Sequence, residues 1–248
     1  MIDFKKLREQ NLAVTKKAVK SSLARDLLAI QAINCIEDID KVSSILANRL
    51  REWYGYYNPE FTKSIHSNEK FSQLVVSMSR ADLLKSLKLD EAHSMGADLE
   101  KKDLDAALEL ARNINDIYSF RKYLEHYLEK ALSDICPNTT AIVGPLLGAK
   151  LLSLAGSIKR LSELPSSTIQ LLGAEKALFR HIRGLGKCPK HGVLVQHTLM
   201  EAAKMKDKGR VARALADKIS IAAKVDYFKG NFVGDKLKAG LDARFKKK

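Results

Sequence analysis

Two long stretches without proline or glycine constrain the fold of this chain more than any other feature. They cover residues 23–54 and 102–135, and apolar residues recur in both at steps of three and four. This spacing places the apolar side chains on one face of an α-helix. A 30-residue helix extends about 45 Å, which is longer than a typical helix of a compact fold. The two stripes are Leu28, Ala32, Cys35, Ile39, Val42, Leu46 and Trp53, and Leu104, Leu108, Ala111, Ile114, Tyr118, Leu124, Leu128, Leu132 and Ile135.

The segment between these stretches predicts a small helical insertion. Gly55 and Pro59 end the first helix in a turn. Two shorter helices are expected over residues 68–95, with a break near residues 86–90. An antiparallel coiled-coil hairpin with a helical tip accounts for this order of elements. An ordinary helical bundle has the same periodicity and is the alternative.

The chain changes character after Pro137, where small residues become frequent. The apolar stretch 141–158 is long enough to span a membrane, but Lys150 lies at its centre. A central lysine costs about 2.5–3.5 kcal/mol on insertion, so we expect a buried helix and no membrane segment. The pattern over residues 208–228 predicts a final helix, followed by a basic tail. No segment alternates with a period of two, so the fold class is all-α.

These patterns divide the chain into a short N-terminal arm (residues 1–20, helical or loose), a coiled-coil domain (21–136) and a helical domain with a basic tail (137–248). Charge follows the same division. Residues 1–136 contain 21 Lys/Arg and 21 Asp/Glu, whereas residues 137–248 contain 22 and 8, so the net charge of +14 belongs to the last part. Such asymmetry favours a polyanionic partner, most often nucleic acid. A generally basic, solubilising surface is the alternative.

The cysteines and the N-terminus indicate a cytoplasmic protein. Cys35, Cys136 and Cys188 are odd in number and far apart, so neither a disulfide framework nor a paired zinc knuckle is expected. The N-terminus has no apolar core behind its charges and does not resemble a signal peptide.

A basic segment over residues 173–198 carries the candidate binding residues. A helix from Ala174 places Lys176, Arg180 and Arg183 on one face, with Ala177, Leu178, Phe179 and Ile182 facing the core. Any solvated amphipathic helix has the same pattern. In the glycine-rich loop that follows, Lys187 and Lys190 can meet phosphates, and His191 offers a flat ring for stacking on an unpaired base. Gln196 and His197 can read base edges or riboses.

The last helical pattern adds a second basic cluster. Arg210 and Arg213 share one face beside Lys208, and Asp207 is a candidate helix cap. We expect these cations to contact RNA together with the basic segment.

An enzymatic site is the competing interpretation of the same segment. Cys188 and the histidines His181, His191 and His197 could form a zinc site or a Cys–His nucleophile pair. No C-x-x-C or H-x-x-x-H pairing supplies ligands, few acids lie nearby to orient a histidine, and no GK[ST] phosphate loop occurs. We therefore expect no catalytic residue, no metal and no cofactor.

Several ordered motifs resemble the Nop-domain family, in its archaeal form: the fibrillarin-associated scaffold proteins of box C/D small ribonucleoproteins. The basic domain carries GPLLGAKLLSLAGSIKRLSELPSSTIQLLGAEKALFRHI, PKHGVLVQH and KGRVARALADKISIAAKVDYFKG. LANRLREWYGYYNPEF and SMGADL resemble the coiled-coil part of the same family. The likeness covers about residues 20–230.

The resemblance implies an RNA-binding assembly factor. In this family the Nop domain recognises a kink-turn guide RNA together with its bound ribosomal-type protein, and the coiled coil mediates self-association into a dimer. Fibrillarin, held by an additional N-terminal domain, transfers a methyl group from S-adenosylmethionine to a ribose 2′-hydroxyl during rRNA processing. The family's stacking histidine corresponds to His191, the GAEK and ALFR positions to Lys176 and Arg180, and the helix-start cations to Lys208, Arg210 and Arg213.

Two departures from the family pattern affect the expected partners. Only about 20 residues precede the coiled-coil pattern, where the family has an α/β domain of a hundred or so, so a direct contact with fibrillarin is left open. The stretch MEAAKMKD stands where the family tends to carry proline and tryptophan. The alternative function is a coiled-coil interaction adaptor with a basic domain that binds nucleic acid nonspecifically.

Overall fold

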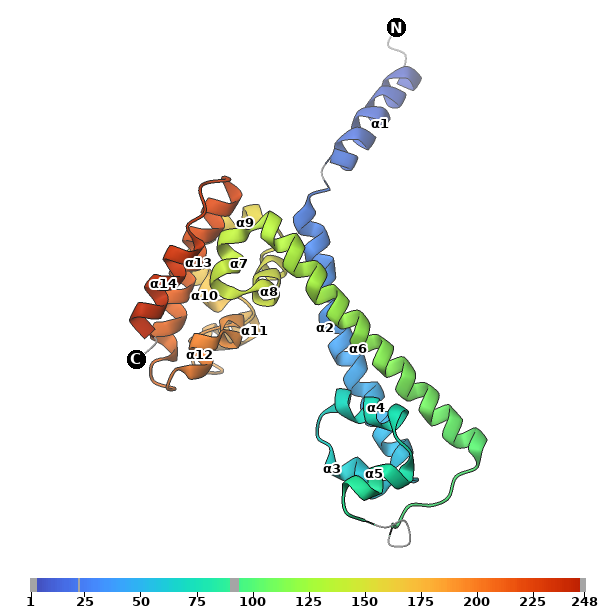
Figure 1. The fold of residues 1–248 in the computed structure, drawn as a ribbon. Coiled ribbons are helices and arrows are strands. Elements are labelled where there is room, and N and C mark those ends of the chain that lie inside the picture. Colours follow the sequence, from blue (N-terminus) through green and yellow to red (C-terminus); the bar gives the residue numbers. More distant parts are fainter. Residues whose placement is uncertain (1–3, 22, 90–93, 246–248) are drawn as a thin grey trace. The chain divides into compact units, whose positions relative to one another are not determined.

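The computed structural model describes residues 4–21, 23–89 and 94–245, which form α-helices and one short 3-10 helix without any strand (Figure 1). The all-α prediction is confirmed. In chain order the helices are α1 (Phe4–Ser21), α2 (Arg25–Gly55), α3 (Pro59–Ser64), α4 (Asn68–Ser77), α5 (Arg80–Ser86), α6 (Lys101–Ile135), α7 (Pro137–Val143), α8 (Pro145–Ala155), α9 (Ile158–Glu163), α10 (Ser166–Leu171), α11 (Glu175–Ile182), η2 (Val193–Gln196), α12 (Thr198–Ala202), α13 (Lys208–Tyr227) and α14 (Gly234–Phe245).

The chain forms two compact units. The hairpin unit is Cys35–His126, and the basic unit combines Met1–Asn34 with Tyr127–Lys248. The long helices α2 and α6 contribute to both. Among the described residues no helix is long and apolar enough to cross a membrane.

In the hairpin unit α2 and α6 run antiparallel, as predicted (Figure 1). Arg121 on α6 pairs with Asp40 on α2, and further along Leu50 on α2 shares a buried core with Ile114 on α6. Both helices begin and end within two residues of the predicted stretches. The observed arrangement is an antiparallel helix pair, and the supercoil of a coiled coil stays a prediction.

The helices α3, α4 and α5 close the end of this pair around an aromatic core. Phe61 and Phe71 are fully buried and stack with ring centroids 5.4 Å apart, and Tyr54 meets both edge-on. Burying large aromatic surfaces in this way stabilises an insertion of short helices that could not persist alone.

The basic unit is built around α13, which packs against α7, α9, α10 and α14. Its core-facing residues Val211, Leu215 and Ile219 are almost fully buried. Near the end of α13 the buried carboxylate of Asp226 accepts hydrogen bonds from the first turn of α7. These contacts fix the body of the unit from which the candidate site extends.

The expected single helix over residues 141–158 is wrong. Pro145 cannot donate the backbone hydrogen bond that a continuous helix requires, so α7 ends at Val143 and α8 begins at Pro145. Gly144 and Gly156 adopt φ values of +80° and +89°, which close the two helices at little steric cost.

Other element predictions are also corrected. Pro59 was expected only to end the first helix in a turn. It also begins a new helix, α3, because its missing N–H is tolerated at the first helical position. The break between the short tip helices falls at Met78, because Ser79 caps the next helix by accepting from the backbone N–H of Asp82. The expected tail contains a further helix, α14, whose few buried positions gave little periodic signal. Residues 246–248 of the expected basic tail and residues 90–93 lie outside the described residues.

Candidate nucleic-acid interface

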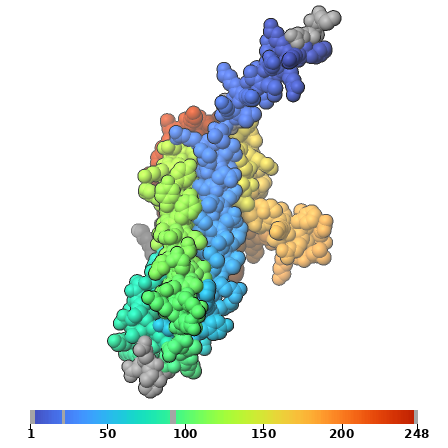
Figure 2. All heavy atoms as spheres, turned by 90° about the vertical axis from the view of Figure 1, so that its right-hand side faces the viewer, coloured from blue at the N-terminus to red at the C-terminus, as the bar shows by residue number. Residues whose placement is uncertain are grey.

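Residues 175–192, which we call the basic lobe, project from the basic unit (Figure 2, orange). Every residue of α11 is exposed or half-buried. The prediction that Phe179 and Ile182 face the core is wrong: 54% of Phe179 and 72% of Ile182 are exposed. The cationic side chains of Lys176 and Arg180 are exposed on the same short helix, as expected.

Local contacts rather than core burial hold the basic lobe in shape. The carboxylate of Glu175 accepts a hydrogen bond from the backbone N–H of Gly173, at 2.6 Å. The guanidinium of Arg183 lies over the ring of Phe179, 4.2 Å from its centroid. Gly184 then turns the chain with a φ of +75°, and Nδ1 of His181 lies 2.8 Å from the carbonyl oxygen of Gly186. Arg183 therefore packs on the lobe while Lys176 and Arg180 remain available.

The return of the lobe to the body is fixed by three hydrogen bonds to α10 and the residue after it. The side-chain amide of Gln170 donates to the carbonyl of Lys190, at 2.7 Å. The backbone N–H groups of Gly192 and Val193 donate to the carbonyls of Gln170 and Leu172. A Cβ on Gly192 would lie 1.8 Å from the Leu172 carbonyl oxygen, so only glycine allows this approach.

These bonds bring Lys190 and His191 next to the start of α13. The side chain of Lys190 lies against the backbone of Gly209, where an added Cβ would be 3.8 Å from its Cδ. The basic lobe and the cations at the start of α13 are therefore neighbours in space. Within the described residues the ring of His191 has no hydrogen-bond partner, and it is half-buried. Its position is fixed through the backbone, and its ring is available for stacking.

The first turn of α13 supplies the remaining cations. Arg210 is exposed, Lys208 is half-buried, and Arg213 is exposed one turn later. The side chain of Asp207 pairs with Arg210 at 3.4 Å instead of capping the helix. The N-terminal N–H groups of α13 add a partial positive charge that favours phosphate.

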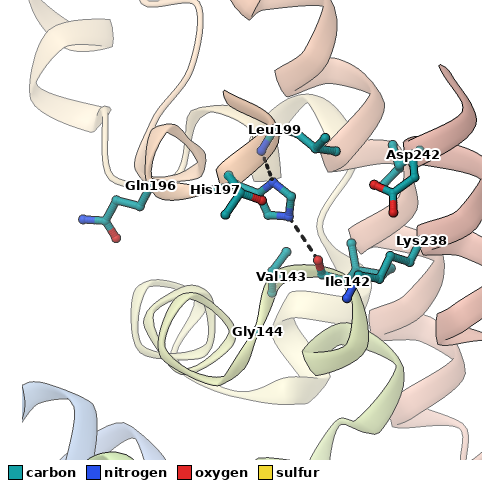
Figure 3. A pocket seen from close by; sticks show the side chains of 10 residues that line it. Ile142, Val143, Gly144, Gln196, His197, Leu199, Lys238 and Asp242 are labelled. Carbon is teal, nitrogen blue, oxygen red and sulfur yellow. Dashed lines mark hydrogen bonds between the residues drawn. The ribbon is translucent and has the colours of Figure 1, made fainter. Parts of the chain in front are cut away.

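Gln196 and His197 line a cavity of about 240 Å³, together with residues at the end of α7 and on α14 (Figure 3). Nδ1 of His197 accepts from the backbone N–H of Leu199 at 3.1 Å, so the ring proton lies on Nε2, which donates to the carbonyl of Ile142 at 3.0 Å. Both ring nitrogens are thus used inside the chain, and His197 caps α12. The side chain of Gln196 extends away from the cavity (Figure 3).

The structure thus brings together Lys176, Arg180, Lys187, Lys190 and His191 in or at the base of the basic lobe, with Lys208, Arg210 and Arg213 beside it. The apolar surface of the lobe, where Phe179, Ile182 and Leu185 are exposed, was not predicted from the sequence. The signal for it was the cluster of glycines after α11, which leaves this short helix little to pack against.

The described residues contain no group of three or more His, Cys, Asp or Glu side chains that could hold a metal ion. Burial raises the pKa of the Cys136 thiol to about 12, with smaller contributions from the nearby carboxylates of Asp226 and Asp26. A thiol held protonated in this way is a poor nucleophile. The cations of the basic lobe and the N–H groups at the start of α13 can bind an anion, and the ring of His191 can stack on a base.

The family model named Nop, described as a snoRNA binding domain, fibrillarin, matches residues 35–247. The chain belongs to the Nop family. An uncharacterized NOP5 family protein of Methanocaldococcus jannaschii is 40% identical over 97% of this chain, and nucleolar protein 58 of Schizosaccharomyces pombe is 38% identical over 81%. A solved structure of a fibrillarin/Nop5p complex contains a chain with the same fold, with a TM-score of 0.58 and 25% identity over 98% of this chain.

These relatives are longer than the present Nop-family chain. It spans 61% of the archaeal relative, 42% of the yeast relative and 78% of the chain in the solved complex. The resemblance inferred from the GAEKALF, PKHG and KGR motifs is confirmed.

Proposed function

We propose that this chain is an RNA-binding scaffold of a box C/D small ribonucleoprotein and not an enzyme. In this proposal it recognises a kink-turn RNA together with the ribosomal-type protein bound to it, and it supports ribose 2′-O-methylation that fibrillarin catalyses. The observation that carries the proposal is the fixed position of Lys190 and His191 beside the start of α13. The names of the relatives, which include nucleolar protein 58 and a fibrillarin/Nop5p complex, support it.

Each part of the site has a distinct role in this proposal. Lys176, Arg180 and Lys187 meet phosphates along the basic lobe, and the cations and N–H groups of α13 meet them at its base. The ring of His191 stacks on an unpaired base, which a kinked RNA exposes and a regular duplex does not. The exposed Phe179, Ile182 and Leu185 offer an apolar surface to the parts of the complex that carry no phosphate.

The decisive experiment is a salt-titrated gel shift on a kink-turn RNA, with and without the kink-turn-binding ribosomal-type protein. We expect binding to require the partner protein and to weaken in His191→Ala by about 1–3 kcal/mol, because the stacking ring is lost. His191→Tyr should retain most of the affinity, since it keeps a flat ring. His66→Ala, an exposed histidine in the hairpin unit, is the matched control.

The same experiment separates the alternative function. Equal binding with and without the partner protein, insensitive to His191, would reduce the site to a nonspecific basic patch on a coiled-coil adaptor. Absence of RNA binding even at low salt would remove the nucleic-acid role altogether.

We further propose that residues 137–248 form the RNA-binding domain, that residues 21–136 form a coiled-coil domain for self-association, and that fibrillarin joins the same complex. A pull-down with purified fibrillarin, in the presence and absence of RNA, distinguishes a contact through this chain from a contact through RNA. The archaeal NOP5 relative supports an archaeal, cytoplasmic protein.

A further inference from the structure

We propose that the turn between α13 and α14 is a second contact site, which binds unpaired bases of a single-stranded nucleic acid. This site is separate from the basic lobe and does not depend on kink-turn recognition. It is defined by Tyr227, Phe228 and Phe232 together with Lys224, Lys229 and Lys236.

The turn exposes aromatic side chains that would ordinarily be buried. Three of them fall within six residues of a chain that is only 6% aromatic. The exposed fractions are 36% for Tyr227, 76% for Phe228 and 54% for Phe232. The rings of Tyr227 and Phe228 contact each other with centroids 5.0 Å apart. Exposed apolar surface of this density usually marks an interaction site.

The backbone of the turn is held in one conformation. The N–H groups of Phe228 and Gly230 donate to the carbonyls of Lys224 and Val225, at 3.0 and 2.9 Å. The N–H of Val233 donates to the side-chain oxygen of Asn138, at 2.6 Å. Lys229 adopts a φ of +52°, a conformation that is unfavourable for a residue with a side chain. The surrounding hydrogen bonds hold this strain, so the rings are displayed on a preorganised support.

The charges around these rings favour a polyanion over a protein partner. The side chains of Lys224, Lys229 and Lys236 are exposed on and beside the turn. Residues 224–236 contain two acids. Asp226 is buried, and its carboxylate accepts four hydrogen bonds, so Asp235 is the one acid of this segment that is exposed. Exposed aromatic rings among lysines are the combination by which proteins bind single strands, because bases stack on the rings and phosphates meet the cations.

The turn cannot be part of the basic lobe. It lies at the opposite end of α13 from α11 and α12 (Figure 1). A helix of 20 residues, as α13 is, extends about 30 Å. One RNA that occupied both sites would have to run along this whole helix.

The test measures binding of a fluorescent single-stranded oligouridine by anisotropy at several salt concentrations. The protein is the full chain carrying Lys187→Ala and Lys190→Ala, which weakens binding to the basic lobe. We expect Phe228→Ala with Phe232→Ala to lower the affinity at least about thirtyfold at every salt concentration, because two stacking rings are lost. Lys224→Ala with Lys236→Ala should instead reduce the salt slope by about 1.4, that is, about 0.7 per lysine. Tyr56→Ala, an equally exposed aromatic in the hairpin unit, is the matched control.

Unchanged affinity in the phenylalanine variant would overturn the proposal, and this is the result expected if the patch binds a protein. An equal loss in Tyr56→Ala would overturn it as well. Both phenylalanines are largely exposed, so the variants should fold, which a melting curve checks. In the otherwise unmodified chain, the phenylalanine variant should bind the kink-turn complex as the wild type does. If the wild type failed to bind the kink-turn complex, the proposed function would be wrong, but the oligouridine result would still test this second site.

Discussion

A single buried carboxylate, that of Asp226, joins segments of the basic unit that lie 88 residues apart. It accepts hydrogen bonds from the backbone and side chain of Asn138, at 2.9 and 2.8 Å, and from those of Thr139, at 2.8 and 2.7 Å. A carboxylate at this position satisfies the otherwise free N–H groups of the first turn of α7 and complements the dipole of that helix.

We therefore expect Asp226→Ala to lower the free energy of unfolding by about 3 kcal/mol, because it leaves several buried donors without an acceptor. Asp226→Asn should lose less, since one acceptor oxygen remains. Urea denaturation measures both. Asp217→Ala, an exposed acid on the same helix, is the control and should have little effect. Equal stability of Asp226→Ala and the control would contradict this account of α7.

The three cysteines are predicted to differ in reactivity. With a thiol reagent at pH 8, exposed Cys188 should react first, half-buried Cys35 more slowly, and buried Cys136 only after unfolding. Burial raises the Cys136 pKa from 9.0 to about 12, so its contribution to stability is complete below pH 9 and is lost as the pH rises towards 12. Cys136→Ser, which does not titrate in this range, should flatten that alkaline loss. Rapid labelling of Cys136 in the folded chain would contradict its burial.

At the scale of single residues, the sequence identifies side chains that could bind RNA but not which of them are free to do so. His191 and His197 look alike in the sequence, six residues apart in the same basic segment. The structure holds the backbone on both sides of His191 and, among the described residues, gives its ring no hydrogen-bond partner. Both nitrogens of the His197 ring are used, one in the cap of α12 and one on the carbonyl of Ile142. That difference depends on contacts with Gln170 and Ile142, which no local pattern reveals.

Among the elements, the basic lobe departs most from the pattern of an amphipathic helix. Phe179 and Ile182 satisfy the spacing of a core face, yet no neighbouring helix covers them among the described residues. Periodicity predicts a face but not what lies opposite it. The long helices α2, α6 and α13 agree with the sequence prediction because their apolar residues recur over many turns. The break before α8 depends on one proline, and α14 has few buried positions, so periodicity predicted neither.

The lobe also carries a testable electrostatic prediction. Removing two of its cations in Lys187→Ala with Lys190→Ala should reduce the slope of log K against log salt concentration by about 1.4–1.8 for the kink-turn complex, because fewer counterions are released. Lys63→Ala with Lys70→Ala, two exposed lysines of the hairpin unit, is the control. An unchanged slope in the lobe variant would place the phosphate contacts elsewhere.

At the scale of the whole molecule, the hairpin unit retains apolar surface that its own helices do not cover. Val42 and Ile45 are exposed on α2, and Phe120 and Tyr123 are exposed on α6 with their rings stacked 6.3 Å apart. Exposed apolar residues on long helices are the surface that self-association would bury.

We expect the wild-type chain to sediment as a dimer at micromolar concentration and Val42→Glu with Ile45→Glu to sediment as a monomer, because burying the new charges is costly. Ser44→Glu adds a charge at an exposed position of α2 that is turned away from Val42 and Ile45, and it should leave the dimer intact. Melting curves check that the variants fold. A monomeric wild type would contradict self-association through this face.

The division into units has a consequence for the order of events during synthesis. The hairpin unit is one continuous stretch, Cys35–His126, so all of it is available once that stretch has emerged from the ribosome. The basic unit is discontinuous, and the donors of Asn138 and Thr139 have no acceptor until Asp226 is made 88 residues later. At 5–20 residues per second this interval is roughly 4–18 s. During that time the first turn of α7 lacks its Asp226 acceptor, and the nascent chain carries the complete hairpin unit ahead of a basic unit that cannot yet close.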